Sequence, residues 1–581
     1  MDLGKDLDNA LRYLGVRGRY NWIVLSHLLI FTSGFPAAMT MILVFITSDP
    51  ESYYCTPPDG FSRNDTIPTS DANNTNDFGK GCHMYEVHDG ILTQNVTNCK
   101  NGYEYVYTYG QTSIVSEFDL VCDQRLLKDT ATTVLMTGLL IGAYPMGHLC
   151  DRFGRKLMAF LSILLYGASG IGLAFAHNYY MFVVMWFLMG VFRQGTMIAG
   201  FVLLIEMLPP ERRALGGLAG NMAWGFAVVT LALLAFLIRN WRHLQLVLSL
   251  GILVALPFWR IVNESVRWLQ SQRRYDDAER ILQQIAKFNR VAAPSKFLQA
   301  SEKEALVQQT STQAPVQQTN IIGATGTDKA LGTNEDLGHK PTVEYSKLNE
   351  DNNGPKRTRL TVLDLFKTPN LAKNTLILTL DWLAASITYY GLSLNATNLA
   401  GNMYLNFFLL SLVEIPAYIM AYFTMEYFGG RKLTTALSLL VAGIACFFTA
   451  WIPETTANGT DLTTAIAAFA MIGKFAISYT WGGIGVYTPE VFPTGVRSAA
   501  NGLLQSLSRI GAMAAPFIVH LNDVSPYLPL NIFGIFAMVA GALTFLLPET
   551  RNAPLPETLE DGEMMGKIPA PSRDQEASDK I

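Results

Sequence analysis

Two stretches carry the strongest indication of the fold: Glu206-Met-Leu-Pro-Pro-Glu-Arg-Arg213 and Glu490-Val-Phe-Pro-Thr-Gly-Val-Arg497. Both follow the pattern E-x-x-P-x-x-x-R, and they lie about 280 residues apart. A long apolar run precedes each stretch, and small residues follow it. The sequence therefore contains the same charged turn twice, in the same kind of surroundings.

Two further elements repeat at nearly the same offset. Glu264-Ser-Val-Arg267 returns as Glu549-Thr-Arg551, and Asp151-Arg-Phe-Gly-Arg-Lys156 returns in weakened form as Glu426-Tyr-Phe-Gly-Gly-Arg-Lys432. Several repeated elements in register indicate a duplicated half. An apolar chain built from two similar halves is typical of a secondary transporter.

The composition is that of a membrane protein. Half of the residues are hydrophobic and 15% are charged, against about 25% charged in a typical soluble domain. The apolar residues form blocks of about 20, the length that crosses roughly 30 Å of hydrocarbon. We predict an all-α membrane protein with twelve transmembrane helices in two pseudo-symmetric six-helix halves. The blocks are 22–46, 132–150, 157–176, 180–206, 217–238, 243–262, 374–394, 403–425, 433–452, 463–488, 499–520 and 527–547.

The distribution of basic residues predicts the orientation. Arg and Lys gather in the loops after the even-numbered spans and are nearly absent from the short loops on the other side. Because cytoplasmic loops carry the excess of positive charge, both termini are predicted to be cytoplasmic. The predicted organisation is a cytoplasmic N-terminal segment 1–21, an N-terminal half 22–262, a cytoplasmic linker 263–373, a C-terminal half 374–547 and a cytoplasmic tail 548–581.

The cytoplasmic segments differ in character. The first 20 residues place leucines on one helical face and predict a helix at the membrane surface rather than a cleavable export signal. The linker begins with amphipathic helices. Residues 307–358 and the tail are polar and without periodicity, which predicts disorder.

The segment 48–131 is then extracellular. It holds four of the six cysteines and three N-x-S/T sequons, which predicts two disulfides in a glycosylated ectodomain. Three pairings are open, and a zinc site is disfavoured because no C-x-x-C spacing occurs. The cysteines are Cys55, Cys82, Cys99 and Cys122, and the glycosylation sites are Asn64, Asn73 and Asn95.

The repeated charged turns predict a cytoplasmic gate. Charged side chains at helix ends can form networks that exist in only one of two arrangements of the halves. The alternative is that they only anchor the topology, although the acidic partners repeat together with the basic ones. The predicted gate residues are Asp151, Arg152, Arg155, Glu206, Arg213, Glu264 and Arg267 in the first half and Glu426, Arg431, Glu490 and Arg497 in the second.

Several motifs resemble a known family. Gly147–Lys156 is similar to the loop motif of the major facilitator superfamily. Narrower matches resemble its organic cation, anion and zwitterion transporter family, which implies polyspecific transport of small organic ions across the plasma membrane. This chain has four ectodomain cysteines where that family often has six, and Tyr427 and Gly430 in a degenerate second loop. The narrower matches are Ser116–Cys122, Asn263–Leu269, Tyr389–Asn395, Asn402–Phe408, Val413–Ala417 and Gly473-Lys474.

The ionisable residues inside spans are candidate substrate contacts, since such groups are costly in a membrane unless they face a cavity or one another. In the resembling family, an arginine at the position of Arg509 accompanies anionic and carnitine-type substrates, which implies a carboxylate-bearing substrate here. Tyr418 also stands where carnitine-type members have tyrosine. Asp381 would meet an ammonium group beside aromatic faces. The full predicted set is Arg509, Asp381, Tyr389, Tyr390, Lys474, Trp382, Arg193 and Tyr418.

Other interpretations of these residues stay open. Lys474 and Glu414 could simply pair, and the aromatic residues could be packing. We predict a transporter of zwitterions or cations of the carnitine and quaternary-amine type, with an organic anion carrier or a broad organic cation facilitator as alternatives. A receptor that keeps the transporter fold is a further alternative.

The sequence also indicates which partners to expect. No phosphate-binding, zinc-helix or nucleophile-elbow motif occurs, so an enzyme or primary pump is disfavoured. No cofactor or metal is predicted, and no basic tract indicates nucleic acid. The expected partners are a small organic ion, a coupling ion and the lipid bilayer.

Overall fold

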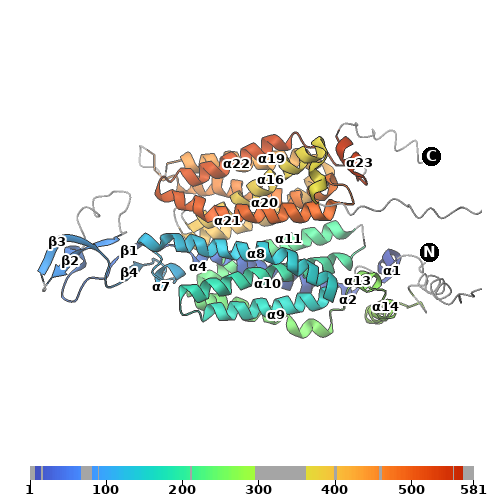
Figure 1. Cartoon of the computed structure of the whole chain (residues 1–581), viewed down its shortest axis with the longest axis horizontal. Helices are drawn as coiled ribbons and strands as arrows, with labels where there is room; N and C mark the ends of the chain where they lie inside the picture. Colours follow the sequence, from blue (N-terminus) through green and yellow to red (C-terminus); the bar gives the residue numbers. More distant parts are fainter. Residues whose placement is uncertain are drawn as a thin grey trace, which may run out of the picture.

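The computed structural model describes residues 7–14, 18–66, 81–88, 91–209, 212–294, 297, 362–397, 399, 402–453, 455–456, 461–551, 553 and 555–566. Helices dominate and form two bundles that lie side by side, one from each half of the chain (Figure 1). Two short two-stranded sheets project from one end of the bundles, and helices α1 and α23 lie at the opposite end.

The first bundle begins with a broken span, Arg19–Ile46. Its helix α2 (Arg19–Leu28) runs into a π-helical turn, η1 (Leu29–Gly34), before α3 (Phe35–Met41) and α4 (Leu43–Ile46). Pro36 lies in the first turn of α3 and has no backbone N–H to donate. The helical hydrogen-bond pattern therefore widens to a π-helical turn just before it. The other spans are α8 (Arg125–Phe153), α9 (Arg155–Ala174), α10 (Tyr179–Glu206), α11 (Arg213–Leu237) and α12 (Trp241–Leu253) with η4 (Leu256–Arg260).

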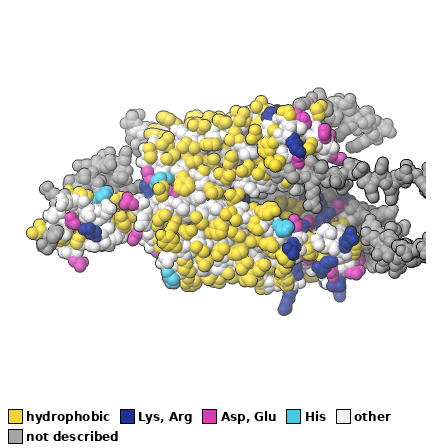
Figure 2. Space-filling view, in the orientation of Figure 1, with side chains coloured by type: hydrophobic (Ala, Val, Ile, Leu, Met, Phe, Trp, Pro, Cys, Tyr) yellow, Lys and Arg dark blue, Asp and Glu magenta, His cyan; other side chains and the backbone are white. Residues whose placement is uncertain are grey.

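The second bundle contains the counterparts of these spans. They are α16 (Pro369–Leu394), the pair α17 (Met403–Leu412) and α18 (Glu414–Tyr427), α19 (Gly430–Trp451), α20 (Thr463–Val491), α21 (Arg497–His520) and α22 (Leu528–Thr544). Figure 2 shows hydrophobic side chains covering the flank of both bundles, with charged side chains gathered at the two ends. This is the surface expected of a protein that spans a bilayer.

Ten segments of the described chain are long and apolar enough to cross a membrane, and α22 is a shorter apolar helix. The remaining helix of the twelve is α16, which carries Asn374, Thr375, Asp381 and Ser386. These polar side chains are buried inside the bundle. A helix that is surrounded by other helices needs less hydropathy than one that faces lipid.

The contacts between the halves follow the duplication. Helix α8 of the first half packs on α21 of the second, and α11 of the first half packs on α17 and α18 of the second. The second span of each half therefore contacts the fifth span of the other. This reciprocal packing is what two copies of one unit produce when they are related by a pseudo-twofold axis.

The ectodomain consists of two antiparallel hairpin-like pairs. Strand β1 (Ser52–Cys55) pairs with β4 (Tyr103–Val106), and β2 (His83–His88) pairs with β3 (Ile91–Asn98). The disulfides join Cys55 to Cys99 and Cys82 to Cys122, which is one of the three pairings that the sequence left open. The short helices are α5 (Arg63–Thr66), α7 (Ile114–Glu117) and η2 (Cys122–Gln124).

A carboxylate of α7 fastens the ectodomain to the bundle. Glu117 accepts hydrogen bonds from Trp241 Nε1 at 2.6 Å and from Arg242 Nε at 2.7 Å, both at the start of α12. The Ser116–Cys122 motif therefore holds the extracellular loop against the sixth span.

The predicted glycosylation sites lie in the segment 48–131, partly outside the described residues. Asn95 is exposed on β3, and Asn64 lies in α5, whereas Asn73 lies outside the described residues.

We expect Asn95→Gln to remove one step of the glycosidase-sensitive gel shift, and Asn64→Gln, Asn73→Gln and Asn95→Gln together to remove most of it. Gel mobility before and after glycosidase measures this. Asn98→Gln is the matched control, since Asn98 is exposed on the same strand without a sequon. Unchanged mobility of the wild type after glycosidase would contradict an extracellular 48–131.

The cytoplasmic helices pack on one another. The leucines of α1 (Leu7–Leu14) are buried in a cluster with residues of α13 (Val266–Ser271) and α14 (Tyr275–Asn289). Asn289 Nδ2 donates to Leu14 O at 3.1 Å, and Asp8 pairs with Arg267. The expectation that the apolar face of α1 lies on the membrane was thus wrong, because α14 covers that face. The amphipathic helices predicted in the linker are present.

The first part of the predicted disordered tail is helical. Helix α23 (Leu559–Met564) begins with a capping box between Thr558 and Asp561. Glu563 accepts hydrogen bonds from the backbone N–H groups of Asn370 and Leu371 at the start of α16. This part of the tail is helical because the start of α16 supplies unsatisfied backbone N–H donors, and Glu563 satisfies them. Residues 307–358, and the tail beyond residue 566, lie outside the described residues.

Candidate functional site

A buried ion pair stands in the middle of the second half. Lys474 Nζ of α20 lies 3.1 Å from Glu414 Oε1 of α18, and the two side chains are 2% and 1% exposed. Glu414 also accepts from the hydroxyls of Tyr389 at 2.9 Å and Tyr418 at 3.1 Å, and Lys474 donates to Ser393 Oγ at 2.6 Å. The simple pairing considered from the sequence is therefore present. Both charges are satisfied within the protein.

Aromatic rings surround this pair and reach the first half. Trp224 of α11 donates its Nε1–H to the Tyr389 hydroxyl at 2.9 Å, which links the halves. The ring of Tyr390 meets that of Tyr389 edge-on at 5.4 Å. Trp481 packs edge-on against both Tyr389 and Trp382. The Lys474 ammonium lies 3.3 Å from the Tyr389 ring centroid, so this ring already accepts a cation on its face.

Arg193 lies beside these rings and Arg509 acts on it from the other half, and neither has an ion pair among the described residues. Arg193 of α10 is 1% exposed, and its guanidinium lies over the Trp224 ring at 5.6 Å. Its Nε and Nη1 have no hydrogen-bond partner among the described residues. Arg509 of α21 is half-buried and acts on Arg193 as a like charge, and it has no ion pair with any described residue. One guanidinium comes from each half, and a buried charge of this kind needs an anionic partner.

Asp381 lies apart from this group. It accepts a hydrogen bond from Thr544 Oγ1 of α22 at 3.0 Å and is fully buried where α16 faces α22. Its second oxygen, Oδ2, has no hydrogen-bond partner in the described part of the chain. The neighbouring Trp382 donates its Nε1–H to Thr488 Oγ1 at 2.9 Å. The structure thus brings together Arg193, Lys474, Tyr389, Tyr390 and Tyr418 of the predicted set, and it places Asp381 inside the second bundle.

At the cytoplasmic end of the first half, Arg155 lies between two acids. It pairs with Asp151 at 3.0 Å and with Glu206 at 3.4 Å. Glu264 accepts from the backbone N–H groups of Arg155 at 2.9 Å and Lys156 at 3.0 Å, so it caps the N-terminus of α9. Gly154 has φ 103°, and a Cβ there would overlap the Glu264 carboxylate. Only glycine fits this turn.

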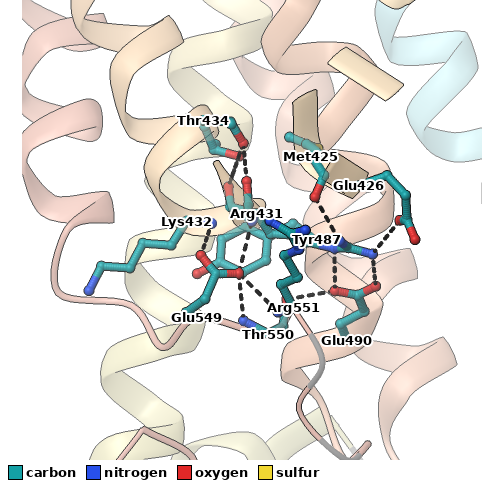
Figure 3. A network of polar contacts seen from close by, with 12 residues as sticks. Met425, Glu426, Arg431, Lys432, Thr434, Tyr487, Glu490, Glu549, Thr550 and Arg551 are labelled. Atoms are coloured by element: carbon teal, nitrogen blue, oxygen red, sulfur yellow. Dashed lines mark hydrogen bonds and ion pairs between the residues drawn. The ribbon is translucent and has the colours of Figure 1, made fainter. Parts of the chain in front are cut away.

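The second half repeats this cluster (Figure 3). Arg431 pairs with Glu490 at 3.1 Å and with Glu426 at 3.3 Å. Glu549 accepts from the backbone N–H groups of Arg431 at 2.8 Å and Lys432 at 3.1 Å, and Gly430 has φ 72°. Glu549 therefore plays the part of Glu264. The predicted gate set omitted it, although its motif repeats the Glu264 motif and signalled its role.

The other predicted gate residues have separate partners. Arg267 pairs with Asp8 and donates to Glu206 O at 3.3 Å, and Arg497 donates to Phe492 O at 3.0 Å. Arg152 is exposed and lies over the Phe153 ring at 5.5 Å, and Arg213 Nε has no hydrogen-bond partner among the described residues. Among the described residues, each charged cluster closes within its own half, and no ion pair joins the halves at the cytoplasmic end.

The halves meet instead at the extracellular end. Arg125 of α8 pairs with Asp523, and Asp129 of α8 faces His520 of α21. Phe45 stacks on Tyr404 at 5.6 Å and meets Phe407 at 4.9 Å, and Thr133 Oγ1 donates to Met513 O at 3.2 Å. The structure is therefore closed on the ectodomain side. Neither the motif repeats nor the hydropathy pattern signalled this set of contacts.

The role of the charged clusters in gating can be tested with a matched set of arginines. We expect Arg155→Ala and Arg431→Ala to lower the transport rate several-fold while surface abundance stays near wild type. Each change leaves two acids at the cytoplasmic end without their arginine. This should bias the equilibrium between the two arrangements of the halves and leave the candidate substrate site unchanged. Arg152→Ala is the control, because Arg152 is exposed and belongs to neither ion-pair cluster. Uptake rate per surface molecule is the measurement. Wild-type rates in both test variants would reduce these residues to topology anchors.

Known proteins resemble this chain in sequence and in fold. The Major Facilitator Superfamily model matches residues 124–301, and the Sugar (and other) transporter model matches residues 353–561. The chain is 32% identical over 569 residues to an organic cation transporter-like protein of Drosophila melanogaster, covering 96% of this chain and 93% of that one. It is 34% identical over 483 residues to solute carrier family 22 member 16 of Xenopus laevis, covering 82% and 75%.

A further relative is similar to this chain in sequence, and a solved structure is similar to it in fold. The chain is 29% identical to organic cation/carnitine transporter 2 of Rattus norvegicus, covering 96% of this chain and 94% of that one. The inward-open xylose transporter XylE from E. coli superposes with a TM-score of 0.54 at 14% identity, covering 92% and 98%. That likeness establishes a common fold.

Proposed function

The chain belongs to solute carrier family 22 of the major facilitator superfamily, and from that premise we propose that it carries small organic zwitterions or cations of the carnitine and quaternary-amine type. It is a multi-pass membrane transporter of small organic ions and not an enzyme. We further propose that the transporter works by alternating access in the plasma membrane. The names of its relatives include organic cation transporters and an organic cation/carnitine transporter.

The observation that carries the proposal is a pair of arginines that have no counter-charge among the residues the structure describes. Arg193 and Arg509 come from different halves, Arg509 acts on Arg193 as a like charge, and neither has an acidic partner among the described residues. A substrate carboxylate would relieve this repulsion and accept charge-assisted hydrogen bonds from both. The nearby acid Glu414 is already neutralised by Lys474. The site therefore favours a ligand with a carboxylate.

The aromatic rings would bind the cationic group of such a ligand. Trp224, Tyr389 and Tyr390 lie around Arg193, and Tyr389 already holds an ammonium against its face. A quaternary ammonium needs such faces rather than hydrogen-bond acceptors, since it has no N–H to donate. A molecule with both groups, a carboxylate and a quaternary ammonium, satisfies both parts of the site. This combination favours a carnitine-type zwitterion over a simple cation.

Comparative uptake tests the proposal. Cells that express the chain should accumulate carnitine faster than tetraethylammonium and faster than an aryl carboxylate. Preferential uptake of the aryl carboxylate would favour an organic anion carrier, which the two arginines without an ion pair in the described part of the chain also suit. Preferential uptake of tetraethylammonium would favour a broad organic cation facilitator, which the relatives' names suggest. Surface biotinylation of the same cells tests the plasma-membrane location, and replacement of external sodium tests for a coupling ion.

A further inference from the structure

We call the contacts of Arg125, Asp129 and Thr133 on α8 with Met513, His520 and Asp523 the extracellular seal. Within it, a carboxylate oxygen faces an imidazole nitrogen. Asp129 Oδ2 lies 3.3 Å from His520 Nδ1, and neither atom has a hydrogen-bond partner in the described part of the chain. A neutral imidazole can place its single proton on Nδ1 and face the carboxylate without a charge, whereas an imidazolium places a proton there and also carries a positive charge. When both ring nitrogens are protonated, the imidazolium and the carboxylate form an ion pair, which attracts more strongly than the neutral contact.

The pair joins the two halves. Asp129 lies on α8 of the first half and His520 at the end of α21 of the second, and these helices form a main contact between the halves. The Asp129 side chain is 6% exposed, whereas His520 is 27% exposed. Water can therefore reach the imidazole, while the carboxylate is held in a low-dielectric setting. Opening the extracellular side must separate them.

The charged side chains around His520 carry a net negative charge that one more positive charge would balance. Asp49 pairs with Lys128 at 2.7 Å and lies 3.9 Å from Arg125, and Arg125 also pairs with Asp523. Asp523 lies 3.7 Å from His520, and the Tyr53 phenol is near Arg125. The acids of this group are Asp49, Asp129 and Asp523, and its permanent cations are Arg125 and Lys128. A neutral His520 leaves one negative charge in excess, and a protonated His520 balances it.

We propose that Asp129 and His520 form a proton-binding site that locks the extracellular side closed. The proposal rests on the two-state cycle proposed above but not on the substrate. The pair exists only when α8 and α21 are in contact, so a proton binds more tightly to the closed arrangement than to the open one. By linkage, external acid favours the closed arrangement, and this preference is lost as the external pH rises. Histidine is the side chain that ordinarily changes charge between about pH 5 and pH 8.

A cysteine behind the seal reports the opening. Thr137 lies below the pair on α8, where its hydroxyl contacts Met513 Sδ of α21 at 3.9 Å. A membrane-impermeant thiol reagent applied outside can reach Thr137→Cys only when α8 and α21 separate. The native free cysteines in the described residues, Cys150 and Cys446, are buried. His177→Cys, in the exposed loop after α9, corrects for the effect of pH on the thiol chemistry itself.

We expect modification of Thr137→Cys, relative to His177→Cys, to slow by about threefold or more between about pH 8 and pH 5.5. Adding His520→Gln should abolish this dependence, and Asp129→Asn should abolish it independently in case one variant folds poorly. His177→Gln is the control that should preserve it. A wild-type ratio that does not change with pH, or a dependence that survives His520→Gln, would overturn the proposal. The assay contains no substrate, so its failure is separate from a failed uptake experiment.

Discussion

Replacing Arg509 by alanine is expected to abolish uptake of carboxylate-bearing substrates and to spare simple quaternary amines. Arg509 has no ion pair with any described residue, so the substrate would provide its counter-charge. If the contact is desolvated, its loss costs on the order of 2–5 kcal/mol in apparent affinity, which is roughly a 30-fold to several-thousand-fold change. Removing a repelling charge should leave tetraethylammonium uptake unchanged or improved.

The measurement is the ratio of apparent affinities for carnitine and tetraethylammonium in surface-normalised cells. Arg509→Lys is the matched variant, since it keeps the charge and loses the planar fork that binds a carboxylate through two hydrogen bonds. We expect it to fall between wild type and alanine. Arg509→Asp should shift preference further toward cations. If Arg509→Ala impairs both substrates equally, the arginine is structural, and the broad cation facilitator becomes the better description.

The charged clusters illustrate what the sequence can predict. Asp151 and Arg155 are four residues apart, and the turn that holds them is written twice, so their proximity is a local property of the chain. The repeat also places Glu206 and Glu264 with them. Duplication turns a distant contact into a pattern that can be read from the sequence.

The candidate substrate region was less predictable, because it depends on which face each helix presents. Asp381 and Tyr389 are both on α16 but eight residues apart, which is about 12 Å along a helix axis. Helix α22 covers Asp381, and nothing in the local sequence indicates that neighbour. Trp224 was missed for the same reason. It links the halves by its bond to Tyr389, yet it stands in an ordinary apolar run.

Amphipathic patterns carry a similar ambiguity. The leucines of α1 show that one face avoids water, but a membrane surface and a second helix satisfy that demand equally well. Only the position of α14 decides between them. The extracellular seal was also hidden, since Asp129 and His520 belong to different halves and to motifs that do not repeat.

Breaking the buried ion pair between Lys474 and Glu414 is expected to be the most damaging change to folding. The two side chains are almost fully buried, and Tyr389, Tyr418 and Ser393 complete their hydrogen bonds. Removing one partner of a buried pair leaves an uncompensated charge, which costs about 3–5 kcal/mol. Lys474→Met alone, or Glu414→Gln alone, should therefore lower both the melting temperature of the purified protein and its surface abundance.

The double variant separates stability from transport. Lys474→Met with Glu414→Gln contains no charge at this place, and glutamine still accepts from the two tyrosines, so stability should recover in large part. Lys373→Met, on the exposed start of α16, is the control that should change little. Recovery of folding without recovery of uptake would mean that the pair has a task in transport as well. Single variants as stable as the wild type would contradict the burial argument, because a charge left alone in this setting must be either solvated or neutralised.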